Sequence, residues 1–138
     1  MVVQEDRLTT LYLLNLEIMG SFIGIFGLFV FIITSNNSKS ILMNSYLESR
    51  NLRQTLTLDV AALVGRIILV TAGIIAAYTT TMRLTQLTQK VLGNEPLAGT
   101  LFPNIWLTVG IWTSFAGGVI ALVGDYKRVQ QSPRLPVQ

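Results

Sequence analysis

The sequence predicts an all-α integral membrane protein with three transmembrane helices. Of its 138 residues, 51% are hydrophobic and only 12% are charged, whereas soluble domains carry about twice that share of charge. Three stretches, residues 11–34, 60–79 and 105–124, are apolar and long enough to cross the roughly 30 Å hydrocarbon layer of a bilayer. We therefore expect a single membrane domain, with short connecting segments and no separate soluble core.

Clear signals bound the first and third segments. In the first, the apolar run 18–34 is interrupted only by a serine and is followed by the polar stretch 35–38. The third is entered through Phe102 and Pro103, where proline suits the first turn of a helix, and it exits through the charged segment 125–128. Both segments are expected to span.

The second segment contains Arg66, which bears on whether it spans. On insertion scales, an arginine near the bilayer centre raises the free energy of insertion by about 2.5–3.5 kcal/mol, and each Ile, Leu or Val lowers it by about 0.3–0.6 kcal/mol. The segment can therefore insert. Few glycines and no prolines occur between residues 41 and 92, which predicts a long helix that passes the bilayer at both ends. Gly93, followed by Pro96, should end it.

Basic residues in the flanking segments predict the orientation, because cytoplasmic loops are enriched in Lys and Arg. One side of a three-span layout carries Lys39, Arg50, Arg53, Lys127, Arg128 and Arg134, against Arg7, Arg83 and Lys90 on the other. The N-terminus is therefore expected outside and the C-terminus in the cytoplasm or an equivalent compartment. The tail, residues 125–138, is basic, contains proline and is expected to be extended at its end. Expected interfacial anchors are Tyr78, Trp106, Tyr126, Lys127 and Arg128.

Three ionisable residues fall in or near the spans: Glu17, Asp59 and Arg66. Such groups are costly in lipid and usually face protein or water with a partner. They are compatible with a proton or ion relay, or with a carboxylate that ligates a pigment magnesium beside an arginine counter-charge. We favour a structural role: an ion pair that locks helix packing, with Glu17 as a candidate partner of Arg66, or an arginine that binds a neighbouring subunit or a lipid headgroup.

Small residues recur at four-residue spacing in all three spans, and such faces let helix backbones approach closely in lipid. The third span has two of these faces side by side, which predicts contact with something beyond the chain. The candidate packing residues are Gly20 and Gly24 in the first span, Ala72, Gly73, Ala76 and Ala77 in the second, and Gly110, Ser114, Gly117 and Gly118 in the third.

The composition excludes several kinds of chemistry. Cysteine and histidine are both absent, which excludes disulfides, thiolate metal sites and histidine-ligated haem. No metal-ligand motif and no catalytic motif is present, so we expect no enzyme and no small-molecule substrate. The net charge of +3 is not arranged in a basic stripe, and no nucleic-acid partner is expected. Lipid is the expected ligand, and a bound pigment remains open.

Three functions remain. The first, which we favour, is a small structural subunit of a larger membrane complex of the energy-converting or light-harvesting type, with membrane lipids and other subunits as partners. The second is a pore former: three spans, an outside N-terminus and a short basic inner tail resemble the layout of phage holins. The third is a membrane or envelope protein of a virus particle.

Overall fold

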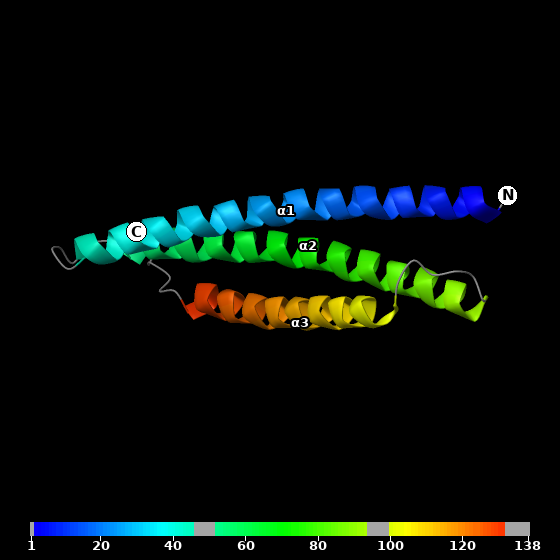
Figure 1. The fold of residues 1–138 in the computed structure, drawn as a ribbon. Coiled ribbons are helices and arrows are strands. Elements are labelled where there is room, and N and C mark those ends of the chain that lie inside the picture. Colours follow the sequence, from blue (N-terminus) through cyan, green and yellow to red (C-terminus); the bar gives the residue numbers. More distant parts are fainter. Residues whose placement is uncertain (1, 46–51, 94–99, 132–138) are drawn as a thin grey trace.

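The computed structural model describes residues 2–45, 52–93 and 100–131. They form three helices and no strand: α1 (Val2–Ser45), α2 (Leu52–Leu92) and α3 (Phe102–Gln131). Consecutive helices run antiparallel, with α2 between the other two (Figure 1). All three are long and apolar enough to cross a membrane. The predicted all-α class with three membrane-spanning helices is confirmed.

All three helices are longer than the roughly 20 residues that a bilayer requires, and α1 and α2 exceed it most. α2 has 41 residues and is long, as predicted, but α1 is longer still, with 44 residues. The polar stretch 35–38 ends the apolar run of α1 without ending the helix. Its last member, Ser38, donates its hydroxyl proton to the carbonyl of Thr34 at 2.9 Å, and no glycine or proline follows before Ser45 to break the helix.

The structure confirms the helix ends predicted on either side of the connection between α2 and α3. α2 ends at Leu92, and the amide of Gly93 still donates to the carbonyl of Gln89 at 2.9 Å. α3 begins at Phe102 with Pro103 in its first turn. Its far end differs from expectation, because residues 125–131 of the tail continue the helix; residues 132–138 lie outside the described residues.

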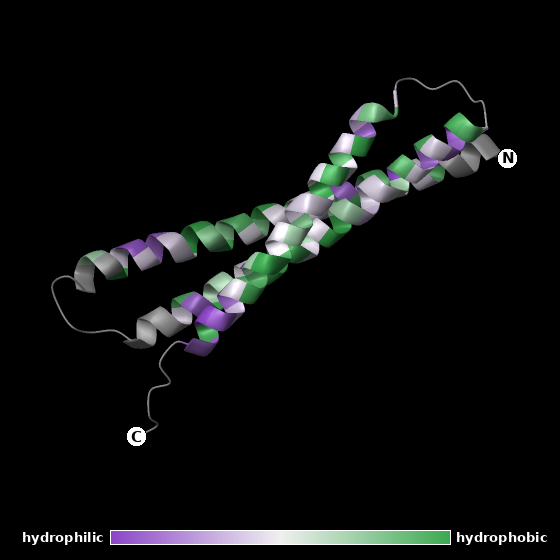
Figure 2. Cartoon of the chain, turned by 90° about the horizontal axis from the view of Figure 1, so that it is seen from below, coloured by the Kyte–Doolittle hydropathy of each residue, from purple (hydrophilic) through white to green (hydrophobic). Residues whose placement is uncertain are grey.

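The helix α2 holds the arrangement together. It packs against α1 and against α3, while no Cα atoms of α1 and α3 come within 8 Å of each other over the described ranges. Figure 2 shows α1 parting from α2 toward one end of the molecule and α3 parting from α2 toward the other. The three helices thus form an open layer, and α2 needs two packing faces.

The interior of this layer is very small. Among the described residues, the buried hydrophobic side chains are Leu13, 1% exposed, and Ala77, 2% exposed. Bulky side chains such as Phe22, Phe26 and Phe29 point outward instead. An apolar surface of this extent requires lipid or protein against it.

Candidate functional site

An ion pair joins α2 to α3. The Nε atom of Arg66 donates to Oδ2 of Asp125 at 3.0 Å, and the two side chains are 27% and 13% exposed. Asp125 follows the uncharged part of α3, and antiparallel packing brings this end of α3 beside the first half of α2. A charge-assisted bond of this length fixes the register of the two helices.

Arg66 also contacts the remaining helix. Its guanidinium carbon lies 4.6 Å from the centroid of the Phe31 ring on α1, within the range of a cation–π interaction. Within the described residues, Nε is the one guanidinium nitrogen with a hydrogen-bond partner. Arg66 is therefore the side chain through which all three helices meet, and its terminal nitrogens retain donor capacity.

A second ion pair joins α1 to α2 near the other end of the layer. Nη2 of Arg83 lies 2.8 Å from Oε2 of Glu17, and each side chain is 33% exposed. Arg66 and Arg83 are 17 positions apart in α2, which corresponds to about 25 Å along a helix. The 16 positions between them, residues 67–82, carry no charge.

The two pairs assign partners that the sequence did not. Glu17 and Arg66, considered as partners of each other, bind Arg83 and Asp125 instead. Asp59 lies half-buried two turns before Arg66 on α2. The spans predicted at 60–79 and 105–124 leave Arg83 and Asp125, respectively, among the flanking charges. The uncharged run 67–82, which ends at Arg83, is the sequence signal that singles this residue out.

The predicted small residues of the first two spans lie between helices. A methyl group in place of the Gly20 hydrogen would lie 2.9 Å from Cγ2 of Ile75 on α2, closer than carbon atoms approach, and one at Gly24 would lie 3.6 Å from Cβ of Ala72. On its other face, α2 places Gly73 against the Phe115 ring of α3.

Two glycines absent from the predicted set, Gly27 and Gly65, lie at the same α1–α2 contact. They face Leu69 and Phe31, respectively. Their spacing from Gly20 and Ala72 is seven residues in each case, and this heptad repeat is the signal that a search at four-residue spacing misses.

The predicted small residues of α3 divide into two groups. Gly118 lies against α2, with Cγ2 of Val70 3.6 Å from the position its Cβ would take. Gly110 and Gly117, together with Gly124, which is not among the predicted packing residues, have no neighbouring atom of the described chain within 4 Å of that position. These three residues are here called the α3 glycine row. Their seven-residue spacing places them on one face of the helix. The row is a surface suited to close backbone approach, and nothing in the described chain occupies it.

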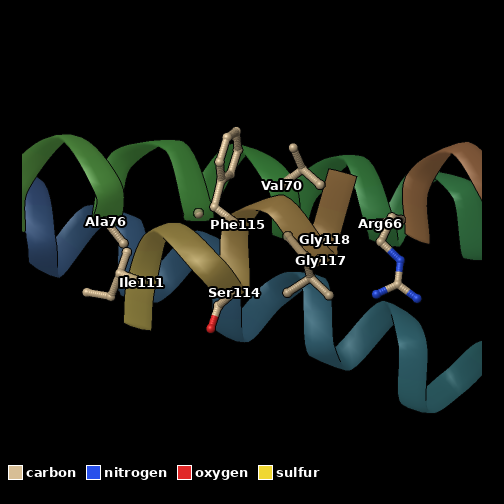
Figure 3. Close-up of a pocket in the computed structure, with 10 residues that line it drawn as sticks. Arg66, Val70, Ala76, Ile111, Ser114, Phe115, Gly117 and Gly118 are labelled. Carbon is tan, nitrogen blue, oxygen red and sulfur yellow. The ribbon is translucent and has the colours of Figure 1, made fainter. Parts of the chain in front are cut away.

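Between α2 and α3 lies an open groove of about 410 Å³. Figure 3 shows Arg66 at one end and Ala76 and Ile111 at the other. Small side chains and glycines form much of its wall, including Gly73, Ala76, Ser114, Gly117 and Gly118. A neighbouring hollow of about 270 Å³ between α1 and α2 shares Gly73 and Ala76 and extends to Glu17. The two hollows thus adjoin, and together they extend along residues 66–76 of α2.

Several threonine hydroxyl groups in these helices donate to their own backbone. Thr79 and Thr80, both buried, donate to the carbonyl of Ala76 at 3.1 and 2.8 Å. Thr71 donates to the carbonyl of Ile67 at 2.9 Å. Bonds of this kind let a helix carry hydroxyls in an apolar setting without a polar partner elsewhere.

Aromatic side chains sit near the ends of the uncharged segments. The expected anchors Tyr78, Trp106 and Tyr126 are all exposed, and Trp106 packs edge-to-face on Phe102 with ring centroids 6.1 Å apart. Trp112 donates its indole proton to the Thr81 hydroxyl at 3.0 Å, which adds a contact between α2 and α3.

Comparisons with known protein families, with curated proteins and with solved structures find no match. The described residues contain no cluster of three or more acidic side chains that could hold a metal ion. The features of the described chain that bear on its function are the two ion pairs, the α3 glycine row and the groove.

Proposed function

We propose that the chain is a structural subunit of a larger integral membrane assembly, in which it packs against helices of other subunits. The observation that carries the proposal is the α3 glycine row. Glycines at equivalent spacing on α1 lie against α2, whereas Gly110, Gly117 and Gly124 face open space. In lipid, close packing of backbones is a main source of helix association, so an unused row of this kind favours a helix from outside the chain.

The positions of the charges support a location within the bilayer. The two ion pairs lie about 25 Å apart along α2, close to the roughly 30 Å thickness of the hydrocarbon layer. Residues 18–38 of α1 and 102–124 of α3 are also uncharged. We place the hydrocarbon between the Glu17–Arg83 pair and the Arg66–Asp125 pair, which moves the second span from 60–79 to 67–82 and puts Arg66 at its edge.

The orientation proposed from the sequence agrees with this placement. The end of the layer with the Arg66–Asp125 pair carries Lys39, Lys127 and Arg128, and the opposite end carries Arg7 and Lys90. The excess of basic residues assigns the Arg66 end to the cytoplasmic side.

A pore is the weaker alternative. A water-filled path needs polar groups that face it, but the hydroxyls of Thr71, Thr108 and Thr113 each donate to the carbonyl four residues earlier. The groove between α2 and α3 is lined mainly by apolar and small residues. Such a surface suits apolar groups better than water.

The proposal is tested on the tagged chain in the membranes of the cell that makes it. After mild detergent extraction, the chain should migrate in a complex with other membrane proteins. Gly110→Leu and Gly124→Leu add bulk where no atom of the described chain lies within 4 Å, so they should release the chain from the complex without unfolding it. Ala116→Leu is the matched control, because Ala116 is exposed on another face of α3. A monomeric native chain would refute the proposal.

A further inference from the structure

We propose that the groove between α2 and α3 binds one anionic phospholipid, with an acyl chain along the groove and the phosphate at Arg66. This inference goes beyond the subunit role and does not depend on it. It rests on the chemistry of the two ends of the groove and on the volume between them.

The groove matches an amphipathic ligand. Its volume of about 410 Å³ falls within the range of roughly 300–1,000 Å³ typical of ligand sites. Its walls include Leu69, Val70, Phe115 and the small residues of α3, and its charged lining residue is Arg66. An apolar channel with one cation at its end fits a hydrocarbon chain that carries one anionic head.

The Arg66 guanidinium is held in a position from which it can bind a phosphate. Asp125 engages Nε and the Phe31 ring covers one face of the guanidinium, so the group is held in place while Nη1 and Nη2 stay available within the described structure. Figure 3 shows these terminal nitrogens directed away from α2. Two N–H groups on one side of a guanidinium suit the oxygens of a phosphate.

Charge also sets the direction of the lipid. The adjoining hollow between α1 and α2 reaches Glu17, a carboxylate already paired with Arg83, and no cation of the described chain lines that hollow to receive an anionic head. The Arg66 end carries Lys127 in addition. An anionic lipid therefore enters with its head at Arg66, in the leaflet on that side, and its chain toward Ala76 and Ile111.

The test uses the purified full chain in phosphatidylcholine bilayers that contain either spin-labelled phosphatidylglycerol or spin-labelled phosphatidylcholine. Electron paramagnetic resonance measures the fraction of each label that the protein immobilises. One arginine near a membrane surface contributes about 1 kcal/mol toward anionic lipid, which predicts an about fivefold preference for phosphatidylglycerol. Much of this preference should persist at high salt, because dissolved ions screen Arg66 in the groove less than they screen Lys127 on the open surface.

Two variants distinguish lipid binding in the groove from lipid binding elsewhere on the surface. Ser114→Leu fills the groove and leaves the Arg66–Asp125 pair intact, so it should lower the preference to below about twofold. Thr113→Leu makes a comparable change on the neighbouring exposed position, which is not part of the groove lining, and should keep the preference. Arg66→Gln should abolish it; if that variant fails to fold, Ser114→Leu still decides.

Several results would overturn the inference. Equal immobilisation of the two lipids by the native chain would exclude an anionic-lipid site. An unchanged preference in Ser114→Leu would place the site elsewhere, and displacement of the lipid by inorganic phosphate would indicate a site for the free ion. The native chain could also form dimers and immobilise no lipid. If Ser114→Leu then disrupted those dimers, the groove would be assigned to a second copy of the chain.

Discussion

Arg66 on α2 and Asp125 on α3 form a hydrogen-bonded ion pair at 3.0 Å, with the ring of Phe31 on α1 against the same guanidinium. This one side chain contacts α1 and α3 from α2, although no Cα atoms of α1 and α3 come within 8 Å of each other in the described residues. It explains how α2 carries an arginine beside an apolar segment, because the charge has a partner in a neighbouring helix instead of facing lipid.

The Arg66–Asp125 pair should stabilise the fold more than the Glu17–Arg83 pair. Asp125→Asn leaves a largely covered guanidinium without its counter-charge and should lower the free energy of unfolding by about 2 kcal/mol. Glu17→Gln removes a partner that is one-third exposed and should cost about 0.5 kcal/mol. Reversible unfolding in mixed micelles measures both values. Equal losses would contradict the linking role of Arg66, and the Arg66→Leu/Asp125→Leu double variant should recover much of the loss.

Replacing either of two glycines one turn apart at the α1–α2 contact should change the stability by different amounts. In Gly20→Ala the new methyl lies 2.9 Å from Cγ2 of Ile75 and 3.3 Å from its Cβ. These atoms are close to the backbone and move little, so we expect a loss of about 1–3 kcal/mol. In Gly24→Ala the nearest atom is 3.6 Å away, and stability should be unchanged or slightly higher. The same unfolding experiment compares the two variants; a larger loss at Gly24 would contradict the described register.

The bilayer boundary on α2 can be mapped with single cysteines, because the natural chain has none. Thr71 and Thr85 form a matched pair: both are exposed, and each donates to the carbonyl four residues earlier. Thr71→Cys lies within the proposed span and should resist a membrane-impermeant maleimide, while Thr85→Cys lies beyond Arg83 and should react. Labelling of Thr71→Cys in intact membranes would contradict the placement between the ion pairs.

Much of the fold follows from local features of the sequence, whereas the ion pairs do not. Apolar length, Pro103 at a helix start and Gly93 after a helix end are signals that act within a few residues, and the helices obey them. Pairing of Glu17 with Arg83 depends instead on how far α1 and α2 slide along each other. That register is set by where Gly20 and Gly27 admit side chains of α2, which is a property of two surfaces together.

The small residues show the same division. Their spacing predicted that α3 has two small-residue faces, one more than packing within a three-helix chain requires. It did not predict which of the two faces contacts α2. The structure assigns Gly118 to α2 and leaves Gly110, Gly117 and Gly124 uncovered. Whether a partner helix covers that row decides between a subunit of an assembly and a self-contained chain.

Photo-crosslinking in native membranes tests this claim most directly. A benzophenone amino acid at Gly110, on the α3 glycine row, is compared with the same amino acid at Ala116, on another exposed face of α3. We predict an adduct with a different membrane protein from position 110 and little or none from position 116. Absence of an adduct at position 110, equal yields at both positions, or adducts only between copies of this chain would contradict its role as a subunit of a larger assembly.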